Sequence, residues 1–396
     1  MVEQQTQDML NSNDFDNRKL VKALGKGIKG CRTLNFEEAA HLIKGFSAGD
    51  ISKAQMAAAM MLMRVRGESV EELAGVASGL KQLVSPQWQH INADIDWPVY
   101  AGKREQLPWL LLAAKMLVKQ GKTLVLHGDS QSLPHRRHVE SYIAALAIPQ
   151  CKTPEQAAEM LAEHGVIYVN SADFIPVLND CRALHQELGL RSLIQMSVRC
   201  VNPCNAPFSL RSFFHPGLDS LHHQVAQLMT EKSVKNADGQ TEFQATDIAI
   251  FKGLQGETEV NPRVSTKVNL LRFDANNIAK LSSFDLPTQL EAFVGAKVGQ
   301  SDLDVVVLAQ LWRGEDIAEK DLSTTQLQQA IASITATMAL VNVLISKELM
   351  ISDALKQAKK AWFNRTQNMS KNMCIPSNLW DSPEQASRSI NLGAGS

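Results

Sequence analysis

Hydrophobic and polar residues alternate in two different ways along this chain, and the pattern changes near Asp94. Between Leu20 and Leu83, apolar residues recur at the spacing of amphipathic helices that pack against one another. Beyond Asp94, short β-branched apolar runs are separated by helical stretches, which is typical of an α/β domain. The pattern therefore predicts a small helical domain at residues 18–91 and a larger α/β domain at residues 94–362.

Three helix-start signals divide the first region into short helices. Each combines a capping Asn or Ser with Glu or Gln three positions later, namely Asn35 with Glu38, Ser52 with Gln55 and Ser69 with Glu72. Such pairs satisfy backbone N–H groups at the start of a helix. Apolar residues such as Met60, Leu62 and Met63 are numerous enough for both a core and a subunit interface. We also expect helices from about 176–200 to pack on this bundle.

The second region alternates strands with helices. Strands are predicted within 123–126, 166–169 and 247–251, and helices within 110–120, 139–146 and 154–164. This order predicts a mostly parallel sheet that is covered by helices and binds ligands beyond its strand ends. A long helical stretch from Thr325 to Trp362 closes the fold. The polar segments 1–17 and 363–396 are expected to be a flexible arm and a disordered tail.

Composition limits the classes of protein to consider. Hydrophobic residues make up 44% and charged residues 20% of the 396 residues, as in ordinary globular proteins. The N-terminus lacks the apolar segment of a secretory signal, and the longest apolar run, Met56 to Met63, is too short to span a membrane. We therefore expect a soluble cytoplasmic protein with no membrane partner. The net charge of −1 means that any nucleic-acid site must be a local basic patch.

The six cysteines carry no metal-site signal. They are scattered, and only Cys200 and Cys204 stand close together. No second pair stands at the spacing of zinc ligands, so idle thiols in a reducing compartment are the expected interpretation.

The segment from Leu34 to Leu83 carries a recognisable motif. It contains LNFEEAAHL and, further on, MRVRGESVEELAG. These residues resemble the opening of the TrpD family, the anthranilate phosphoribosyltransferases, and weaker similarity runs on to about residue 360. The same motif occurs in pyrimidine nucleoside phosphorylases. The resemblance therefore implies the fold, and it does not by itself identify the reaction. It also implies a homodimer through the N-terminal helices.

The first phosphate-binding loop departs from that family. Its members carry a glycine-rich GTGGD loop, whose backbone N–H groups cradle the pyrophosphate of phosphoribosyl pyrophosphate. This chain reads VYAGKREQLPWLL at that place. Gly102 is the glycine that remains, and Lys103 and Arg104 stand beside it. In this loop, cationic side chains replace the backbone cradle.

The second loop, KHGNR in the family, reads LHGDSQSLPHRRH here. His127 and Gly128 match, and Asp129 stands in place of the asparagine. Arg136 and Arg137 stand in the stretch where family members have serines. The resemblance therefore implies a second loop with added positive charge.

The third loop supplies a magnesium-binding Asp-Glu pair in the family. Here it reads GETEVNP, so Glu259 matches the glutamate, Thr258 replaces the aspartate, and Glu257 adds a carboxylate one position earlier. Magnesium prefers hard oxygen ligands, so Glu257 and Glu259 form a weak metal-site prediction. Mg²⁺ is expected only if transferase activity is retained.

Two positions also differ where the aromatic acceptor would enter. His185 stands where the family has an arginine, and Val198-Arg199 replaces a Gly-Pro pair. Since anthranilate is an anion, the loss of that arginine removes an obvious counter-charge.

Basic residues gather in these rewritten loops. Residues 99–138 contain seven lysines and arginines against two acidic residues, and Arg191, Arg199 and Arg211 follow in a stretch without carboxylates. A divergent, YbiB-like branch of the family has similar YAGKR and LPW residues and is associated with nucleic-acid binding. The resemblance therefore implies a nucleic-acid or phosphate site, with no catalytic residue, formed by Gly102, Lys103, Arg104, His127, Gly128, Arg136, Arg137, Arg191 and Arg199. Trp97, Tyr100 and Trp109 stand close enough in sequence to stack bases.

Several alternatives stay open. Lys115, Lys119 and Lys122 fit a solvated helix face, Trp97 and Trp109 fit core anchors, and His127 fits a structural role. The first hypothesis is a non-specific nucleic-acid binder, whose ligand is single-stranded DNA, double-stranded DNA or RNA. The second is a pentosyl transferase that acts on an acceptor other than anthranilate. A scaffold for another protein is the third hypothesis.

Overall fold

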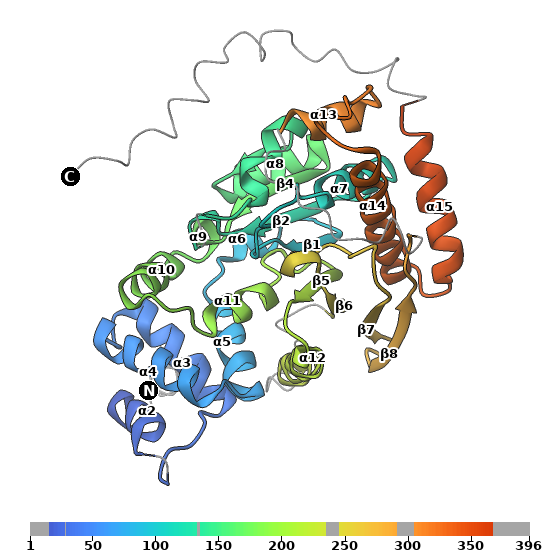
Figure 1. Ribbon diagram of the computed structural model, residues 1–396. Coiled ribbons are helices and arrows are strands. Elements are labelled where there is room, and N and C mark those ends of the chain that lie inside the picture. Colours follow the sequence, from blue (N-terminus) through green and yellow to red (C-terminus); the bar gives the residue numbers. More distant parts are fainter. Residues whose placement is uncertain (1–15, 28, 133–134, 235–244, 291–304, 367–396) are drawn as a thin grey trace, which may run out of the picture.

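One eight-stranded sheet forms the centre of the larger domain (Figure 1). The computed structural model describes residues 16–27, 29–132, 135–234, 245–290 and 305–366. The strands are β1 (Ile95–Pro98), β2 (Leu124–Gly128), β3 (Gln150–Cys151), β4 (Val166–Asn170), β5 (Phe208–Phe213), β6 (Asp247–Lys252), β7 (Thr266–Phe273) and β8 (Ala279–Leu286). Their order is β3-β4-β2-β1-β5-β6-β7-β8, with β1 to β6 parallel and β7 and β8 antiparallel. The predicted mostly parallel sheet is confirmed.

The helices form the bundle and cover the sheet. They are α2 (Asn17–Gly25), α3 (Phe36–Ala48), α4 (Lys53–Arg66), α5 (Val70–Gln82), α6 (Pro86–Gln89), α7 (Leu110–Lys119), α8 (Pro154–His164), α9 (Ser171–Phe174), α10 (Val177–Leu188), α11 (Ile194–Ser197), α12 (Leu218–Val234), α13 (Val306–Arg313), α14 (Thr324–Ile345) and α15 (Ile351–Phe363). The predicted capping boxes at Asn35, Ser52 and Ser69 form with both of their hydrogen bonds.

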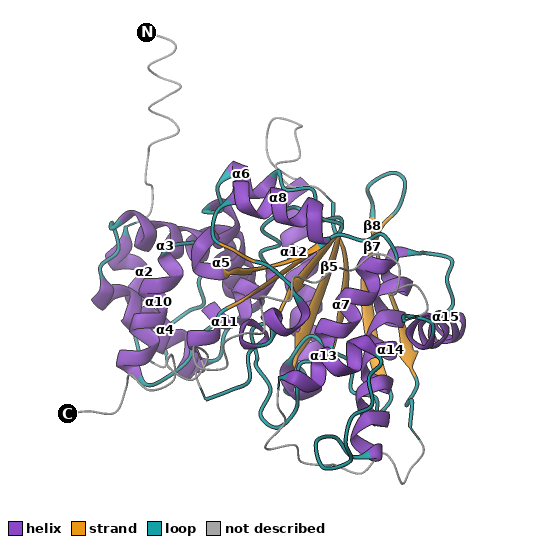
Figure 2. Cartoon of the chain, turned by 90° about the horizontal axis from the view of Figure 1, so that it is seen from above, coloured by secondary structure: helices purple, strands orange, loops and turns teal. Residues whose placement is uncertain are grey.

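Successive strand residues face two different helical layers, because side chains alternate across a sheet. Leu124 and Leu126 of β2 pack in the apolar cluster that contains α7, α13, α14 and α15. Val125, between them, packs in the cluster of the opposite face, which contains α8 and the N-terminal bundle. Figure 2 shows the two layers, with α7, α13 and α14 on one side of the strands and α8 and α12 on the other.

The helical domain is completed by segments from far along the chain. Helix α10 contacts α4, and α11 and α12 contact α5, so the packing expected for residues 176–200 is confirmed. Met60 and Met63 are wholly buried, whereas Leu62 is half-buried. The two methionines therefore serve the core of this domain.

Three elements differ from the sequence-based expectation. Residues 139–146 form two short 3₁₀ turns, Val139–Ser141 and Ile143–Leu146, instead of a helix, with Tyr142 at φ −120° between them. The stretch from Thr325 to Trp362 is two helices, because Ser346 has an extended backbone that ends α14. The β7–β8 hairpin was not expected, since the outer strand β8 is polar and mostly exposed.

Helix α14 is long and apolar enough to cross a membrane. It packs instead in the core, with 78% of its most apolar window buried, so it gives no indication of a membrane protein. Of the expected flexible arm, the structure describes Asp16 and Asn17, and the Asp16 carboxylate caps α2. Residues 1–15 and 367–396, which include most of the expected tail, lie outside the described residues.

Candidate functional site

A cleft of about 410 Å³ lies beyond the carboxyl ends of the parallel strands, against helices α4, α11 and α12. Its walls come from the segments that follow β1, β2, β5 and β6, the place where open α/β sheets bind ligands. Among the lining residues of the described chain, Glu68 is the one acidic side chain. Five arginines line the cleft: Arg64, Arg104, Arg136, Arg191 and Arg199. Four of the predicted site residues are thus brought together.

The arginines of the cleft act on one another electrostatically. Burial lowers the pKa of Arg136 most, the nearby charges of Arg104, Arg191 and Arg199 lower it further, and the Glu257 carboxylate opposes them. Its guanidinium reaches only the carbonyls of Ala101 and Gly102, both at 3.4 Å. Within the described part of the chain, its Nε has no hydrogen-bond partner. Cations gathered with so little neutralisation attract an anion strongly.

Arg199 forms the base of the cleft. Its guanidinium donates to the carbonyls of Ser212 at 3.2 Å and Gly256 at 3.3 Å. Burial lowers its pKa, and the nearby Glu257 carboxylate opposes that shift. Glu257 is itself buried and accepts from the Gly102 N–H at 2.9 Å. One carboxylate therefore lies behind the arginines without facing the solvent.

Lys103 does not belong to the cleft, so its predicted place there is wrong. Its side chain is wholly buried and forms an ion pair with Glu259, which is equally buried. Glu259 also accepts from the Leu110 N–H at 2.9 Å and from the Ser333 hydroxyl at 2.8 Å. Burial lowers the pKa of Lys103, while Glu259 favours its charged form. The hydroxyl and N–H groups around the pair complete a fully satisfied internal contact.

Gly102 and Gly128 have structural reasons to be glycine. Gly102 has φ 61°, and a Cβ there would lie 2.9 Å from the Cβ of Arg136. A Cβ on Gly128 would lie 2.6 Å from the Val99 carbonyl. The Gly102 N–H already donates to Glu257. Gly102 therefore has no free N–H for a phosphate, and Gly128 does not line the cleft. The phosphate-binding role predicted for both glycines does not fit this arrangement.

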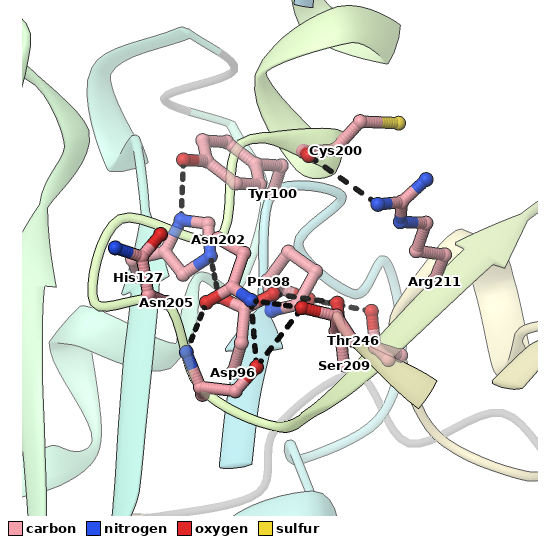
Figure 3. Close-up of polar contacts among 12 residues, drawn as sticks. Asp96, Pro98, Tyr100, His127, Cys200, Asn202, Asn205, Ser209, Arg211 and Thr246 are labelled. Carbon is pink, nitrogen blue, oxygen red and sulfur yellow. Dashed lines mark hydrogen bonds and ion pairs between the residues drawn. The ribbon is translucent and has the colours of Figure 1, made fainter. Parts of the chain in front are cut away.

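His127 lies in a buried polar network away from the cleft (Figure 3). Its Nε2 contacts Asp96 Oδ1 at 2.8 Å and its Nδ1 contacts the Tyr100 hydroxyl at 2.7 Å. Asp96 also accepts from the Ser209 hydroxyl at 2.6 Å. The network joins β1, β2 and β5, so the structural interpretation of His127 is confirmed and its predicted phosphate contact is wrong.

Arg137 and the aromatic residues also lie outside the cleft. The Arg137 backbone pairs with Lys103 in an antiparallel bridge. Trp97 is buried and its indole N–H donates to the Thr258 carbonyl at 2.9 Å, and Trp109 is 2% exposed. Both tryptophans are core anchors, so they cannot stack bases.

Two of the lysines expected near the site lie on another surface. The ammonium groups of Lys115 and Lys119 lie 5.8 Å and 5.2 Å from the centroid of the Trp312 ring. Trp312 belongs to α13, on the helical layer opposite α12. These lysines therefore contribute nothing to the charge of the cleft.

Comparison with known proteins shows which proteins this chain resembles. Residues 18–83 match the model described as the helical bundle domain of the glycosyl transferase family. The anthranilate phosphoribosyltransferase of Burkholderia mallei is 23% identical over 304 residues, which cover 76% of this chain and 84% of that protein. The uncharacterized protein YbiB of Escherichia coli is 24% identical over 261 residues, covering 65% and 77%. Over most of its length, this chain is similar to TrpD proteins.

Solved structures agree with that assignment of the fold. The TrpD-like chain superposes on anthranilate phosphoribosyltransferase from Thermus thermophilus with a TM-score of 0.63 at 15% identity, covering 89% of this chain and 95% of that one. The enzyme from Saccharomyces cerevisiae, in complex with PRPP and Mg, gives a TM-score of 0.61 at 12% identity, with coverage of 89% and 95%. At identities this low, the structural likeness establishes a shared fold and nothing more.

The carboxylates of the TrpD-like protein do not fit a magnesium ion. Glu259 is satisfied by Lys103, the Leu110 N–H and the Ser333 hydroxyl, and Glu257 accepts from the N–H groups of Gly102 and Thr258. Among the described residues, no three His, Cys, Asp or Glu side chains form a metal-binding group. The Lys103 ammonium supplies the positive charge that a metal would bring. The metal site predicted at Glu257 and Glu259 is therefore replaced by an internal ion pair.

The place expected for an aromatic acceptor is filled by side chains. Asp129 pairs with Arg182 at 3.1 Å, and His185 contacts Ser192 at 2.8 Å and Gln195 at 2.7 Å. Asp129, Arg182, His185 and Gln195 line a cavity of about 20 Å³, which has room for about one water molecule. No aromatic ring enters this space without displacing the side chains.

Sequence reasoning missed other residues of the cleft. Arg64, Phe214, His215 and His222 line it, and Phe214 is 47% exposed. His222 stacks on Phe213 with ring centroids 6.1 Å apart. Burial, then Arg199 and Arg211, lower the pKa of His222 to about 4. Arg64 lies in the helical motif that indicated the fold. That motif did not indicate a binding site.

Proposed function

We propose that this TrpD-like protein binds nucleic acid in its arginine-lined cleft and does not transfer a phosphoribosyl group to anthranilate. The observation that supports this most is the gathering of five arginines around one concave surface whose lining contains Glu68 as its acidic residue. Guanidinium groups bind phosphate oxygens in a bidentate geometry, and successive phosphodiesters present a row of such oxygens.

The charge distribution also supports a local site. The whole chain has a net charge of −1, so its surface as a whole attracts nucleic acid weakly. The cleft concentrates positive charge, and a concave wall of low dielectric strengthens its field. Exposed Phe214 at its edge offers a face for a base. A single strand presents both an accessible backbone and unpaired bases, which favours single-stranded nucleic acid as the ligand.

The alternative is a pentosyl transferase that acts on an acceptor other than anthranilate. The fold shared with the yeast enzyme that binds PRPP and Mg favours it. The small cavity at His185 and the pairing of Lys103 with Glu259 count against it, because transfer needs room for an acceptor and a cation for the leaving pyrophosphate.

Titration of the purified full-length protein against a fluorescent single-stranded oligonucleotide across a salt series tests the proposal. We expect the logarithm of the binding constant to fall linearly with the logarithm of salt concentration, with a slope of about −0.7 for each phosphate contacted. Arg136→Ala with Arg191→Ala should weaken binding, and exposed Arg18 on α2 provides the matched control Arg18→Ala.

A parallel titration with phosphoribosyl pyrophosphate separates the two functions. Binding of this sugar phosphate that depends on magnesium, without any oligonucleotide binding, would overturn the proposal and favour the transferase. Binding of neither ligand would favour a scaffold role.

The homodimer and the cytoplasmic location stay predictions. Val65, 87% exposed in the last turn of α4, is an apolar side chain that a dimer through the N-terminal helices would cover. Light scattering of wild type and Val65→Lys tests this, because a charge at such an interface should release monomers.

A further inference from the structure

A second basic groove adjoins the arginine-lined cleft. It has a volume of about 320 Å³ and lies beside the segments that follow β6. Arg104, Lys252 and Arg263 line it, and Glu105 is the acidic residue among the lining residues that the structure describes. Lys252 is exposed and Arg263 is half-buried. This second groove therefore has the same sign of charge as the first cleft.

Three residues belong to both hollows and form a ridge between them. Arg104, Phe214 and Gln255 line the cleft and the second groove alike. Because one guanidinium faces both, the positive surface continues across the ridge without interruption. A chain of phosphates that follows the surface passes from Arg136 and Arg199 over the ridge to Lys252 and Arg263.

The ridge is held in place by a strained residue. Gln255 has φ 57° and ψ 22°, a left-handed conformation that a residue with a side chain seldom adopts. Its side-chain oxygen accepts from the Arg104 N–H at 2.7 Å and the Glu105 N–H at 3.4 Å. Strain of this kind persists where the surroundings require it, often at binding sites. Here it fixes the backbone that carries Arg104.

Phe214 is the exposed aromatic side chain of the ridge. It is 47% exposed, and the His215 ring contacts it edge-on with centroids 5.1 Å apart. The interplanar angle of 78° shows that the His215 ring does not stack face to face on Phe214. An aromatic face between two basic hollows matches the alternation of base and phosphate along a single strand.

We infer that one single-stranded polynucleotide crosses the ridge, with phosphates in both hollows and a base stacked on Phe214. The inference rests on the proposed nucleic-acid binding. It adds the path of the bound chain, its single-stranded state and a dependence of affinity on the strand length that reaches both hollows. A duplex offers no unpaired base to Phe214, so the geometry selects a single strand.

The test uses the full-length protein and oligothymidylates from about 4 to about 16 nucleotides, the range of site sizes on single-strand-binding folds. Affinity should rise steeply until the strand reaches both hollows and then level off. Lys252→Gln with Arg263→Gln should remove that rise. Lys359→Gln with Lys360→Gln, at two exposed positions of α15, is the charge-matched control.

Phe214→Leu examines the stacking separately. It should weaken thymidylate binding by roughly tenfold, since base–aromatic stacking contributes about 1–3 kcal/mol. It should leave unchanged the binding of an abasic strand with the same number of phosphates. Phe363→Leu, at a 65% exposed phenylalanine outside both hollows, is the control, and thermal melting checks that each variant folds.

The outcomes distinguish the inference from the function on which it rests. If no oligonucleotide binds, the proposed function fails. If strands bind but the Lys252 and Arg263 pair leaves the length dependence intact, the path across the ridge is wrong. If duplex DNA binds as tightly as single strands and Phe214→Leu has no effect, the assignment of strand state is wrong.

Discussion

Lys103 and Arg104 are neighbours in the sequence and lie in opposite environments. The Lys103 ammonium is wholly buried and paired with Glu259, whereas the Arg104 side chain is exposed on the ridge between two hollows. One cation completes an internal contact, and the other is available to a ligand. Local charge density along a sequence therefore does not measure the charge of a surface, because adjacent side chains take different directions from the same loop.

The comparison extends to the whole site. Behind the wall of the cleft, charges are matched: Glu259 with Lys103, and Glu257 with backbone N–H groups. At the rim, arginines face one another with little compensation. Removal of a buried charge should lower stability, and removal of a rim charge should lower binding. The following predictions separate these two effects.

The largest expected effect is that of Lys103→Met on stability. It leaves the Glu259 carboxylate buried without its cation, which costs about 3–5 kcal/mol of the free energy of unfolding. Urea denaturation followed by circular dichroism measures the loss. Adding Glu259→Gln should recover part of it, because the uncompensated charge is gone. An unchanged midpoint for Lys103→Met would show that the buried pair does not stabilise the fold.

The next effect is that of Arg136→Ala combined with Arg191→Ala on binding. Hydrogen bonds to charged groups contribute about 1.5–3 kcal/mol each, so the loss of two arginines should lower affinity for a single strand by at least about 100-fold. Stability should stay the same or rise, since the pKa of Arg136 is lowered partly by its arginine neighbours. If this variant melted at a lower temperature and kept its affinity, the two arginines would serve stability and not binding, which contradicts the role assigned to the rim.

His222 gives a pH dependence of intermediate size. Its pKa in the folded protein is about 4, below the value of about 6.5 for an unfolded histidine. As the pH falls from about 6.5 to about 4, the unfolded chain gains a proton that the folded protein does not, so stability falls by about 2–3 kcal/mol. His185, with a pKa also near about 4, contributes in the same window.

The variant His222→Gln should flatten this pH profile. Stability curves between pH 7 and pH 4 for the wild type and the variant check this. Bound phosphates should also raise the pKa of His222, so binding below about pH 6 should take up protons. Identical profiles for both proteins would exclude His222 as a source of the acid sensitivity.

The smallest effect is that of Lys115→Ala with Lys119→Ala. Both ammonium groups lie over Trp312 on the opposite helical layer, so oligonucleotide affinity should change by less than about twofold. The oligonucleotide titration in low salt is the most sensitive check. A loss as large as that of the rim arginines would place the ligand on α7 and contradict the comparison.

The fold could be predicted from the sequence because its signals are local. Capping boxes at Asn35, Ser52 and Ser69 and apolar runs of strand length depend on neighbouring residues, and the structure confirms them. The β7–β8 hairpin was missed because β8 has an exposed face and a polar pattern. The helix expected at 139–146 was wrong because the backbone leaves the helical conformation at Tyr142, where φ is −120°.

The site was predictable only in part, because side-chain direction depends on distant partners. Arg136 and Arg199 lie in the cleft as expected, but Lys103 pairs with a carboxylate 156 positions along the chain. Both ring nitrogens of His127 are likewise hydrogen-bonded, one to Asp96 and the other to Tyr100. Arg64 was missed since it comes from the helical domain, which contributes to the cleft only through the folded arrangement.

Photo-cross-linking of a short strand that contains 5-iodouracil tests the central claim most directly. With the full-length protein, we predict cross-links on the peptide that contains Phe214 and His215, and their loss in Arg136→Ala with Arg191→Ala. Cross-links that map instead to α7 around Lys115 and Lys119, and persist in the arginine variant, would contradict the assignment of the cleft as the nucleic-acid site.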